Sequence, residues 1–310
     1  MAARQPLVVD EVGIVDLPID YSVGTLRARL VRVERRAAWL TLCIHHVVLD
    51  GPSQQLVHAH LTSILEAQLS NHPVPRAHDA SVLARNAIAR YVTTQSLPRE
   101  PALPSHATLR LPFARPLAEQ EADQRSASSS WHVADVTIVA AQSSARRLSV
   151  TLNAFLLGTL AWTLRSVSGQ QHFAIWQTYL GRGMEELHTV GSFSTTVPMT
   201  FDICDGVGLD AVCHHVQAET QRMLAREVFV QTAQRATVAY ELNDLRPLPR
   251  PVEQKQKAIK ISLVDLFFIV NQFADGYDAV LLYDASKYDV SGVEVCMKSW
   301  MSAWMSLGGL

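Results

Sequence analysis

Cysteine is scarce in this sequence, and long apolar runs are missing. The four cysteines, Cys43, Cys204, Cys213 and Cys296, are scattered without any CxxC spacing, so the sequence indicates neither a zinc site nor a disulfide framework. No uninterrupted stretch reaches the roughly 18 apolar residues of a membrane span. The opening MAARQPLVVDE lacks the apolar core of a signal peptide. We therefore expect a cytoplasmic protein.

An excess of charge of either sign is also absent. The 310 residues include 27 Lys and Arg and 29 Asp and Glu, which gives a formal net charge of -2. This balance gives no reason to expect nucleic acid or a membrane as a partner. The sequence has no glycine-rich phosphate loop, and its histidine clusters do not form the HExxH pattern of a helical zinc site. Nucleotide chemistry and a metal site are therefore not expected.

Length and composition favour a globular chain with more than one lobe. With 48% hydrophobic residues the chain can bury a sizeable core, and its length predicts about two domains or lobes. Residues 98–130 are polar and rich in proline at first, which is typical of a linker or crossover loop. We predict a partial N-terminal lobe over residues 1–118, a linker over 119–130 and a C-terminal lobe over 131–310.

Hydrophobic periodicity predicts strands that alternate with helices, which favours a layered α/β fold. Helices are predicted where apolar residues recur on one face, or on all faces for a buried helix. Strands are predicted where apolar residues alternate or run together. The predicted elements are a hairpin of strands near 26–33 and 38–44, a helix over 53–69, a strand in WHVADVTIV (131–139), a buried helix over 151–168 and a helix over 209–226.

The most informative stretch is HHVVLDG, residues 45–51. It follows residues 39–44, which are nearly continuous apolar and predict a buried strand whose C-terminal end delivers His45 and His46 to a surface or crevice. A neutral imidazole can take a proton from an amine or alcohol at neutral pH, as a general base for acyl transfer must. An isolated pair of histidines is more often a packed strand end, but the complete pattern favours a catalytic site.

The end of this stretch predicts a tight turn into a helix. Asp50 can fold back through the turn and hold the loop, and Gly51 allows backbone angles that a side chain would forbid. Ser53 is a good N-cap for the helix that follows. The remaining histidine clusters, His58 with His60 and His214 with His215, are interpreted as exposed helix residues.

HHxxxDG is the signature of the CoA-dependent acyltransferase superfamily, and its surroundings resemble the condensation domains of nonribosomal peptide synthetases. Four further segments resemble the family in the family's order: GTLRARLVRVERRAAWLTLCIHH, VTLNAFLLGTLAWTLRSVSGQ, VGSFSTTVPMTF and VLLYDASKYDVSGVEVCMKSWMSAWMSL. The third resembles the family's G-x-F-x-N-T-x-P-x-R strand. The resemblance implies a two-lobed chloramphenicol-acetyltransferase-like α/β sandwich, with an incomplete N-terminal lobe.

The sequence also departs from the family pattern. A segment with an arginine-bearing motif is expected before the first strands and is not recognisable, so we interpret the chain as N-terminally shortened. In the family an arginine holds the motif aspartate, and Asp50 therefore needs another partner. Thr195 stands where asparagine is usual, and Thr200 where arginine is usual. The candidate partners of Asp50 lie on the neighbouring predicted strand and are Arg27, Arg29 and Arg32.

The resemblance implies a condensation-type acyltransferase in nonribosomal peptide or related natural-product biosynthesis. It would join a carrier-protein-bound acyl or peptidyl thioester to a small-molecule amine or alcohol, forming an amide or ester. His46 would take or organise the proton, with His45 in support. Asp50 would be structural, and Gly51 would offer a close backbone N–H to the oxyanion. No tightly bound cofactor is expected, because the phosphopantetheine arm of the carrier protein, or CoA, carries the substrate.

Three alternatives stay open at this point. The chain could be a non-catalytic condensation-like domain that docks carrier proteins. It could instead be a relative that performs epimerisation, cyclisation or dehydration at the same site. Another chain could also complete the N-terminal lobe, since an uncovered sheet edge can pair with a second polypeptide.

Overall fold

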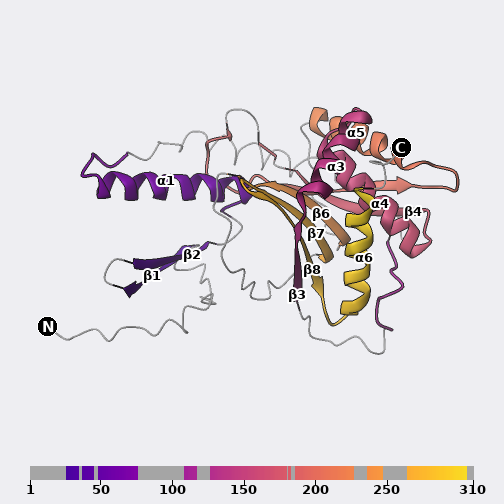
Figure 1. Ribbon diagram of the computed structural model, residues 1–310, viewed down its shortest axis with the longest axis horizontal. Coiled ribbons are helices and arrows are strands. Elements are labelled where there is room, and N and C mark those ends of the chain that lie inside the picture. Colours follow the sequence, from indigo (N-terminus) through magenta and orange to yellow (C-terminus); the bar gives the residue numbers. More distant parts are fainter. Residues whose placement is uncertain are drawn as a thin grey trace. The chain divides into compact units, whose positions relative to one another are not determined.

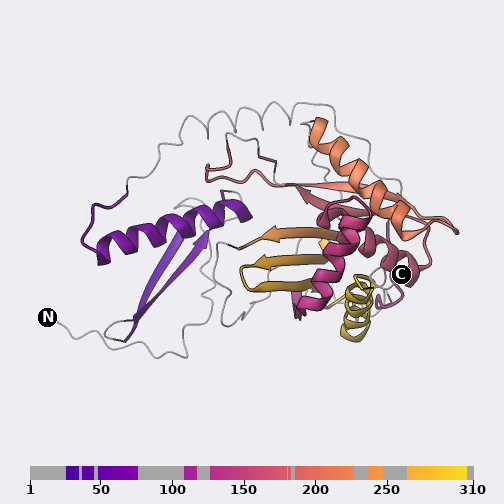
Figure 2. The same ribbon diagram turned by 45° about the horizontal axis from the view of Figure 1, so that its top comes forward.

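The computed structural model describes residues 26–34, 37–44, 48–75, 108–116, 126–179, 181–182, 186–226, 236–246 and 264–305. They belong to two compact units, shown in Figures 1 and 2. The small unit contains the described parts of residues 1–87 together with those of Arg182–Phe193, and the large unit contains the others. The mixed α/β character predicted from the sequence is confirmed.

The described part of the small unit contains a hairpin, a helix and residues from Arg182–Phe193. Strands β1 (Leu26–Glu34) and β2 (Ala37–Ile44) are antiparallel, as predicted, with Leu26 opposite Ile44. Helix α1 (Gly51–Leu69) buries only Ser53 and Ala67. Its predicted apolar face is therefore only partly covered, and Leu65 on that face is 58% exposed.

The large unit contains a six-stranded sheet in the order β3-β8-β7-β6-β4-β5. The pairs β4–β6 and β6–β7 are parallel and the other neighbours are antiparallel. Parallel neighbours need crossover connections, and helix α5 (Leu209–Arg226) lies in the connection that leads from β5 to β6. The strands are β3 (Ser126–Val133), β4 (His172–Tyr179), β5 (Thr195–Asp202), β6 (Ala236–Asp244), β7 (Val264–Phe273) and β8 (Gly276–Asp284).

Four helices of the large unit are among the described residues, and α4 (Leu152–Ser168) lies at the centre of its core. Ten of its residues are buried, as predicted for a helix that is apolar on nearly all sides. The side chain of Thr151 caps its first turn, and Gly169 ends it in a left-handed conformation with φ 72°. The other helices are α3 (Asp135–Arg147), α5 (Leu209–Arg226) and α6 (Val290–Ala303).

Trp300 of α6 joins the helices to the sheet. Its side chain is fully buried, and its indole N–H donates to the Leu156 carbonyl at 3.0 Å and to Thr159 Oγ1 at 3.1 Å. Its ring packs edge-on against Phe268 of β7 and Trp304, with centroids 5.4 Å and 5.0 Å away. The indole therefore satisfies its polar group within the core while it fills a large volume.

One predicted element is wrong. WHVADVTIV was expected to be a strand, but β3 ends at Val133 and α3 begins at Asp135. Ile138, Ala141 and Ala145 have helical spacing and are buried, so packing of this face overrides the β propensity of the short VTIV run.

The start of β3 also differs from the sequence interpretation. The strand begins at Ser126, inside the residues predicted as a linker. Among the described strands β3 is at the edge of the sheet and pairs only with β8. Small polar residues are tolerated in this edge strand because one of its faces is exposed, as at Ser128 and Ser130.

None of the described helices is by itself long and apolar enough to cross a membrane. Helices α3 and α4 pass that test only as a pair, with a bend of 102° between them.

We predict that Gly158→Ala destabilises the large unit by about 1–3 kcal/mol, because overpacking forces neighbouring atoms to move. A Cβ at Gly158 would lie 2.7 Å from Cys213 Sγ and 3.0 Å from Cys213 Cα on α5. The measurement is urea unfolding of both proteins. Adding Cys213→Ala should recover only part of the loss, since the clash with the backbone of residue 213 remains. Unchanged stability of Gly158→Ala would contradict the close approach of α4 and α5.

Candidate functional site

The two motif histidines, His45 and His46, lie outside the residues that the structure describes. The chain on either side of them is described. Strand β2 ends at Ile44, opposite Leu26, and Asp50 is the N-cap of α1. The segment that carries the histidines therefore connects a paired strand end to a helix N-terminus.

Asp50 is buried, with 2% of its surface exposed. Its Oδ1 accepts hydrogen bonds from the Ser53 backbone N–H at 3.0 Å and from Arg182 Nη2 at 2.6 Å. Its Oδ2 accepts from the Phe193 N–H at 3.0 Å. The carboxylate thus caps α1 and binds two residues that lie far away in the sequence. These contacts join the start of α1 to residues 182–193.

The predicted cap was wrong. Ser53 does not cap α1 but lies in its first turn, and its backbone N–H donates to the cap Asp50. The expected unusual backbone at Gly51 is also wrong, because Gly51 is the first residue of the helix. A residue with a side chain adopts helical angles as well. A role that requires glycine at position 51 must therefore depend on its lack of a side chain and not on its backbone angles.

Arg182 is the partner of Asp50, and its side chain is 1% exposed. The chain reaches it through Gly181, whose φ of 59° favours glycine. Arg182 Nη1 donates to the carbonyls of Glu186 and Thr189, both at 2.6 Å. Its guanidinium carbon lies 4.3 Å from the centroid of the Phe193 ring, a cation–π contact. The buried cation is thus surrounded by acceptors and an aromatic face.

Of the candidates from the neighbouring strand, Arg32 is exposed, and the side chains of Arg27 and Arg29 lie outside the described residues. Among the described side chains, the cation that bonds Asp50 is Arg182. The sequence offered one signal for Arg182, since it directly follows Gly181 at the end of the buried run HFAIWQTYL. That signal does not identify its partner, because Arg182 is separated by 132 residues from Asp50.

The surroundings of Asp50 keep it ionised. Burial on its own raises the pKa of the Asp50 carboxyl, but the hydrogen bonds from Arg182, Ser53 and Phe193 outweigh burial and lower that pKa below 3.8. A carboxylate with a lowered pKa is a poor proton acceptor at neutral pH. Asp50 is therefore suited to hold the turn rather than to accept a proton.

The other predicted residues are placed as follows. His58 and His60 are exposed on α1, and His214 and His215 are exposed on α5, as interpreted from the sequence. Both histidines of the second pair bond backbone carbonyls, those of Leu148 and Asp210 for His214 and that of Thr200 for His215. Within the described ranges, no group of three His, Cys, Asp or Glu side chains could hold a metal ion.

The residues that depart from the family's strand motif are both on β5. Thr200 is exposed. Thr195 starts the strand opposite Tyr179. Its hydroxyl is buried and has no hydrogen-bond partner in the described part of the chain.

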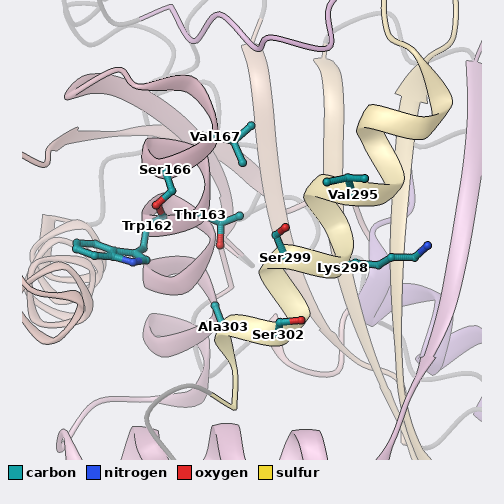
Figure 3. A pocket seen from close by; sticks show the side chains of 9 residues that line it. All are labelled: Trp162, Thr163, Ser166, Val167, Val295, Lys298, Ser299, Ser302 and Ala303. Carbon is teal, nitrogen blue, oxygen red and sulfur yellow. The ribbon is translucent and has the colours of Figure 1, made fainter.

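The large unit carries an open groove of about 620 Å³ between α4 and α6 (Figure 3). Among the described residues that line it, Lys298 is the one with a charged side chain, and none is a histidine or a carboxylate. The groove therefore offers no general base. Its lining residues are Trp162, Thr163, Ser166, Val167, Val295, Lys298, Ser299, Ser302 and Ala303.

We predict that Arg182→Met destabilises the small unit by about 3–5 kcal/mol, because it removes the buried cation that bonds the Asp50 carboxylate at 2.6 Å. Arg165→Met is the matched control. Arg165 pairs with Asp205 at 2.8 Å, but the Asp205 side chain is 87% exposed and stays solvated. This control should cost less. Denaturant unfolding combined with amide hydrogen exchange of α1 measures both, and equal losses would contradict a buried pair.

The lowered pKa of Asp50 predicts a pH dependence of stability. The ionised carboxylate stabilises the fold above 3.8, its value when unperturbed, and this contribution is lost as the pH falls through the lowered pKa of the folded protein. Asp50→Asn lacks that charge at every pH. The difference in unfolding free energy between wild type and Asp50→Asn should therefore be largest at neutral pH and shrink below pH 3.8. A difference that stays constant would contradict an ionised Asp50.

The sequence matches the family model of the condensation domain over residues 17–229, which is more than half of the chain. A comparison with curated protein sequences gives no match. Among solved structures, the first condensation domain of the calcium-dependent antibiotic synthetase, in complex with a substrate analogue, has a TM-score of 0.66 and 16% identity. That match covers 92% of this chain and 70% of the other.

Two further solved structures show the same fold. The epimerization domain from the third module of tyrocidine synthetase B has a TM-score of 0.67 at 14% identity, over 92% of this chain and 71% of that one. The condensation domain for chain release from the enacyloxin polyketide synthase has a TM-score of 0.64 at 14% identity, over 92% and 60%. The predicted chloramphenicol-acetyltransferase-like fold is confirmed, and the chain belongs to the condensation domain family.

Proposed function

We propose that this chain is a condensation-type acyltransferase that acts on acyl or peptidyl thioesters of carrier proteins. The observation that carries the proposal is the buried ion pair of Asp50 and Arg182 at the end of HHxxxDG. The two side chains are 0% and 1% exposed and their atoms approach to 2.6 Å.

A buried ion pair is a weak source of stability, because desolvation of both charges offsets their attraction. A well-packed apolar pair would stabilise the same turn at less cost. The pair does fix the relative orientation of the two side chains, since a guanidinium and a carboxylate have defined hydrogen-bond geometry. We infer that the pair is present to set the position of the turn that follows His46.

In the proposed reaction an amine attacks the carbonyl carbon of the thioester. A C–N bond forms and the C–S bond breaks. The proton that leaves the amine nitrogen passes through His46 to the departing thiolate, so the products are an amide and a free thiol. His45 supports the loop, and the backbone N–H of Gly51 is the proposed donor to the developing oxyanion. An alcohol acceptor would give an ester by the same steps.

The proposed partners follow from the family. Condensation domains of peptide and polyketide synthases act with carrier protein domains, and a small amine or alcohol is the proposed acceptor here. The phosphopantetheine arm, or CoA, would carry the acyl group, and no bound cofactor is required for the steps above.

The test is product formation from carrier-bound acyl thioesters and a panel of amines and alcohols, followed by mass spectrometry. We expect His46→Ala to lower the rate by about 10²- to 10⁴-fold, the usual contribution of general acid–base catalysis. His58→Ala is the matched control, because His58 is exposed on α1, and it should keep full activity.

Three other results would contradict this proposal. Equal product with wild type and His46→Ala would exclude a role for His46 in acyl transfer. Carrier binding without turnover would identify a docking domain. Deuterium uptake from heavy water at the acyl α-carbon, without condensation, would identify epimerisation.

A further inference from the structure

We propose that Ser53 is a positioning residue for the acyl transfer: its hydroxyl joins the first turn of α1 to Gly191 and so fixes the backbone that follows the histidine loop. This inference rests on the proposed function, and it adds a residue that acts through His46 rather than on the substrate.

The hydroxyl of Ser53 has its full set of hydrogen bonds. It donates to the Gly191 carbonyl at 2.7 Å, and it accepts from the Gly191 N–H at 2.9 Å and from Arg182 Nη2 at 2.5 Å. A serine hydroxyl offers one donor and two acceptor positions. Since Ser53 is fully buried, water cannot replace any of these bonds.

The Ser53 hydroxyl bonds both backbone polar groups of Gly191. The N–H and the carbonyl of Gly191 both bond the same Ser53 oxygen, so the peptide planes on either side of Gly191 are oriented together. The Gly191 carbonyl also accepts from the Asp50 N–H at 3.2 Å, and the Phe193 N–H donates to Asp50. The backbone of 191–193 is therefore bonded to the motif turn at Asp50 and at Ser53.

Ordinary helical serines do something else. Ser63, ten residues later on α1, donates to the Ala59 carbonyl four residues before it at 3.0 Å and is exposed, which is the common local pattern. Ser53 instead bonds a residue 138 positions away. The hydroxyl of Ser53 thus makes a tertiary contact and not a local one. Ser63 provides a control on the same helix.

Gly191 tests the same junction from the opposite side. A Cβ at Gly191 would lie 2.5 Å from Cε2 of Phe193 and 2.9 Å from its Cζ. The ring would have to move, and that ring lies on the guanidinium of Arg182. Gly191→Ala should therefore disturb the junction without removing any hydrogen-bonding group of α1.

The experiment compares Ser53→Ala, Gly191→Ala and the control Ser63→Ala in two assays. The first measures kcat and KM with an acyl carrier protein and an amine. We expect kcat to fall about 10- to 100-fold in the first two variants, as for a small misplacement of a catalytic group. KM for the carrier should be unchanged, and Ser63→Ala should match wild type. In a His46→Ala background Ser53→Ala should cause no further loss.

The second assay does not depend on activity. The protein is labelled with ¹³C-histidine, and the His46 imidazole signal is assigned by its loss in His46→Ala. We expect this signal to move or broaden in Ser53→Ala and Gly191→Ala but not in Ser63→Ala. If wild type is inactive, the proposed function fails while this assay still decides the role of Ser53.

Two results would overturn the inference. One is a His46 signal and a kcat in Ser53→Ala that equal those of wild type. The other is a loss of kcat of the same size in the wild-type and His46→Ala backgrounds, which would show that Ser53 does not act through His46. If Ser53→Ala does not fold, as judged by hydrogen exchange of α1, Gly191→Ala decides between the same outcomes.

Discussion

The geometry of the candidate site depends on one buried ion pair, that of Asp50 and Arg182. A lone buried carboxylate would be protonated or would destabilise the fold, and a lone buried guanidinium would need other acceptors. Together they neutralise each other, and backbone groups bond Nη1 of Arg182 and Oδ2 of Asp50. The turn after the histidines, the start of α1 and the segment that ends at Phe193 all meet at this pair.

The two units obtain their structure by different means. The large unit has a continuous apolar core between its sheet and its helices, with α4 and Trp300 at the centre. In the small unit α1 buries only two of its residues, so apolar packing of this helix contributes little. Hydrogen bonds to Asp50 and Ser53 therefore contribute more to fixing the position of this helix. Such bonds have narrow angular limits, which suits a site that must hold a loop in place.

Much of the fold could be predicted from local patterns. The hairpin of β1 and β2, the buried helix α4 and the helix α5 could all be predicted from the spacing of apolar residues. Burial of one face is a local property of a helix or strand. The start of α3 could not be predicted in this way. The residues Val136 to Val139 suit a strand by propensity, and only the burial of Ile138 and Ala141 in the core makes them helical.

For the site, the sequence by itself determined the chemical groups: two histidines, an aspartate and a glycine at fixed spacing, and hence the hypothesis of acyl transfer. Only the tertiary structure decided which residues hold that motif. The motif is held by Arg182, Gly191 and Phe193, which lie in a segment more than a hundred residues away. The hydroxyl of Ser53 bonds that segment and does not cap its own helix. A sequence pattern encodes neighbours along the chain, whereas the partner of a buried charge is set by the path of the backbone through the fold.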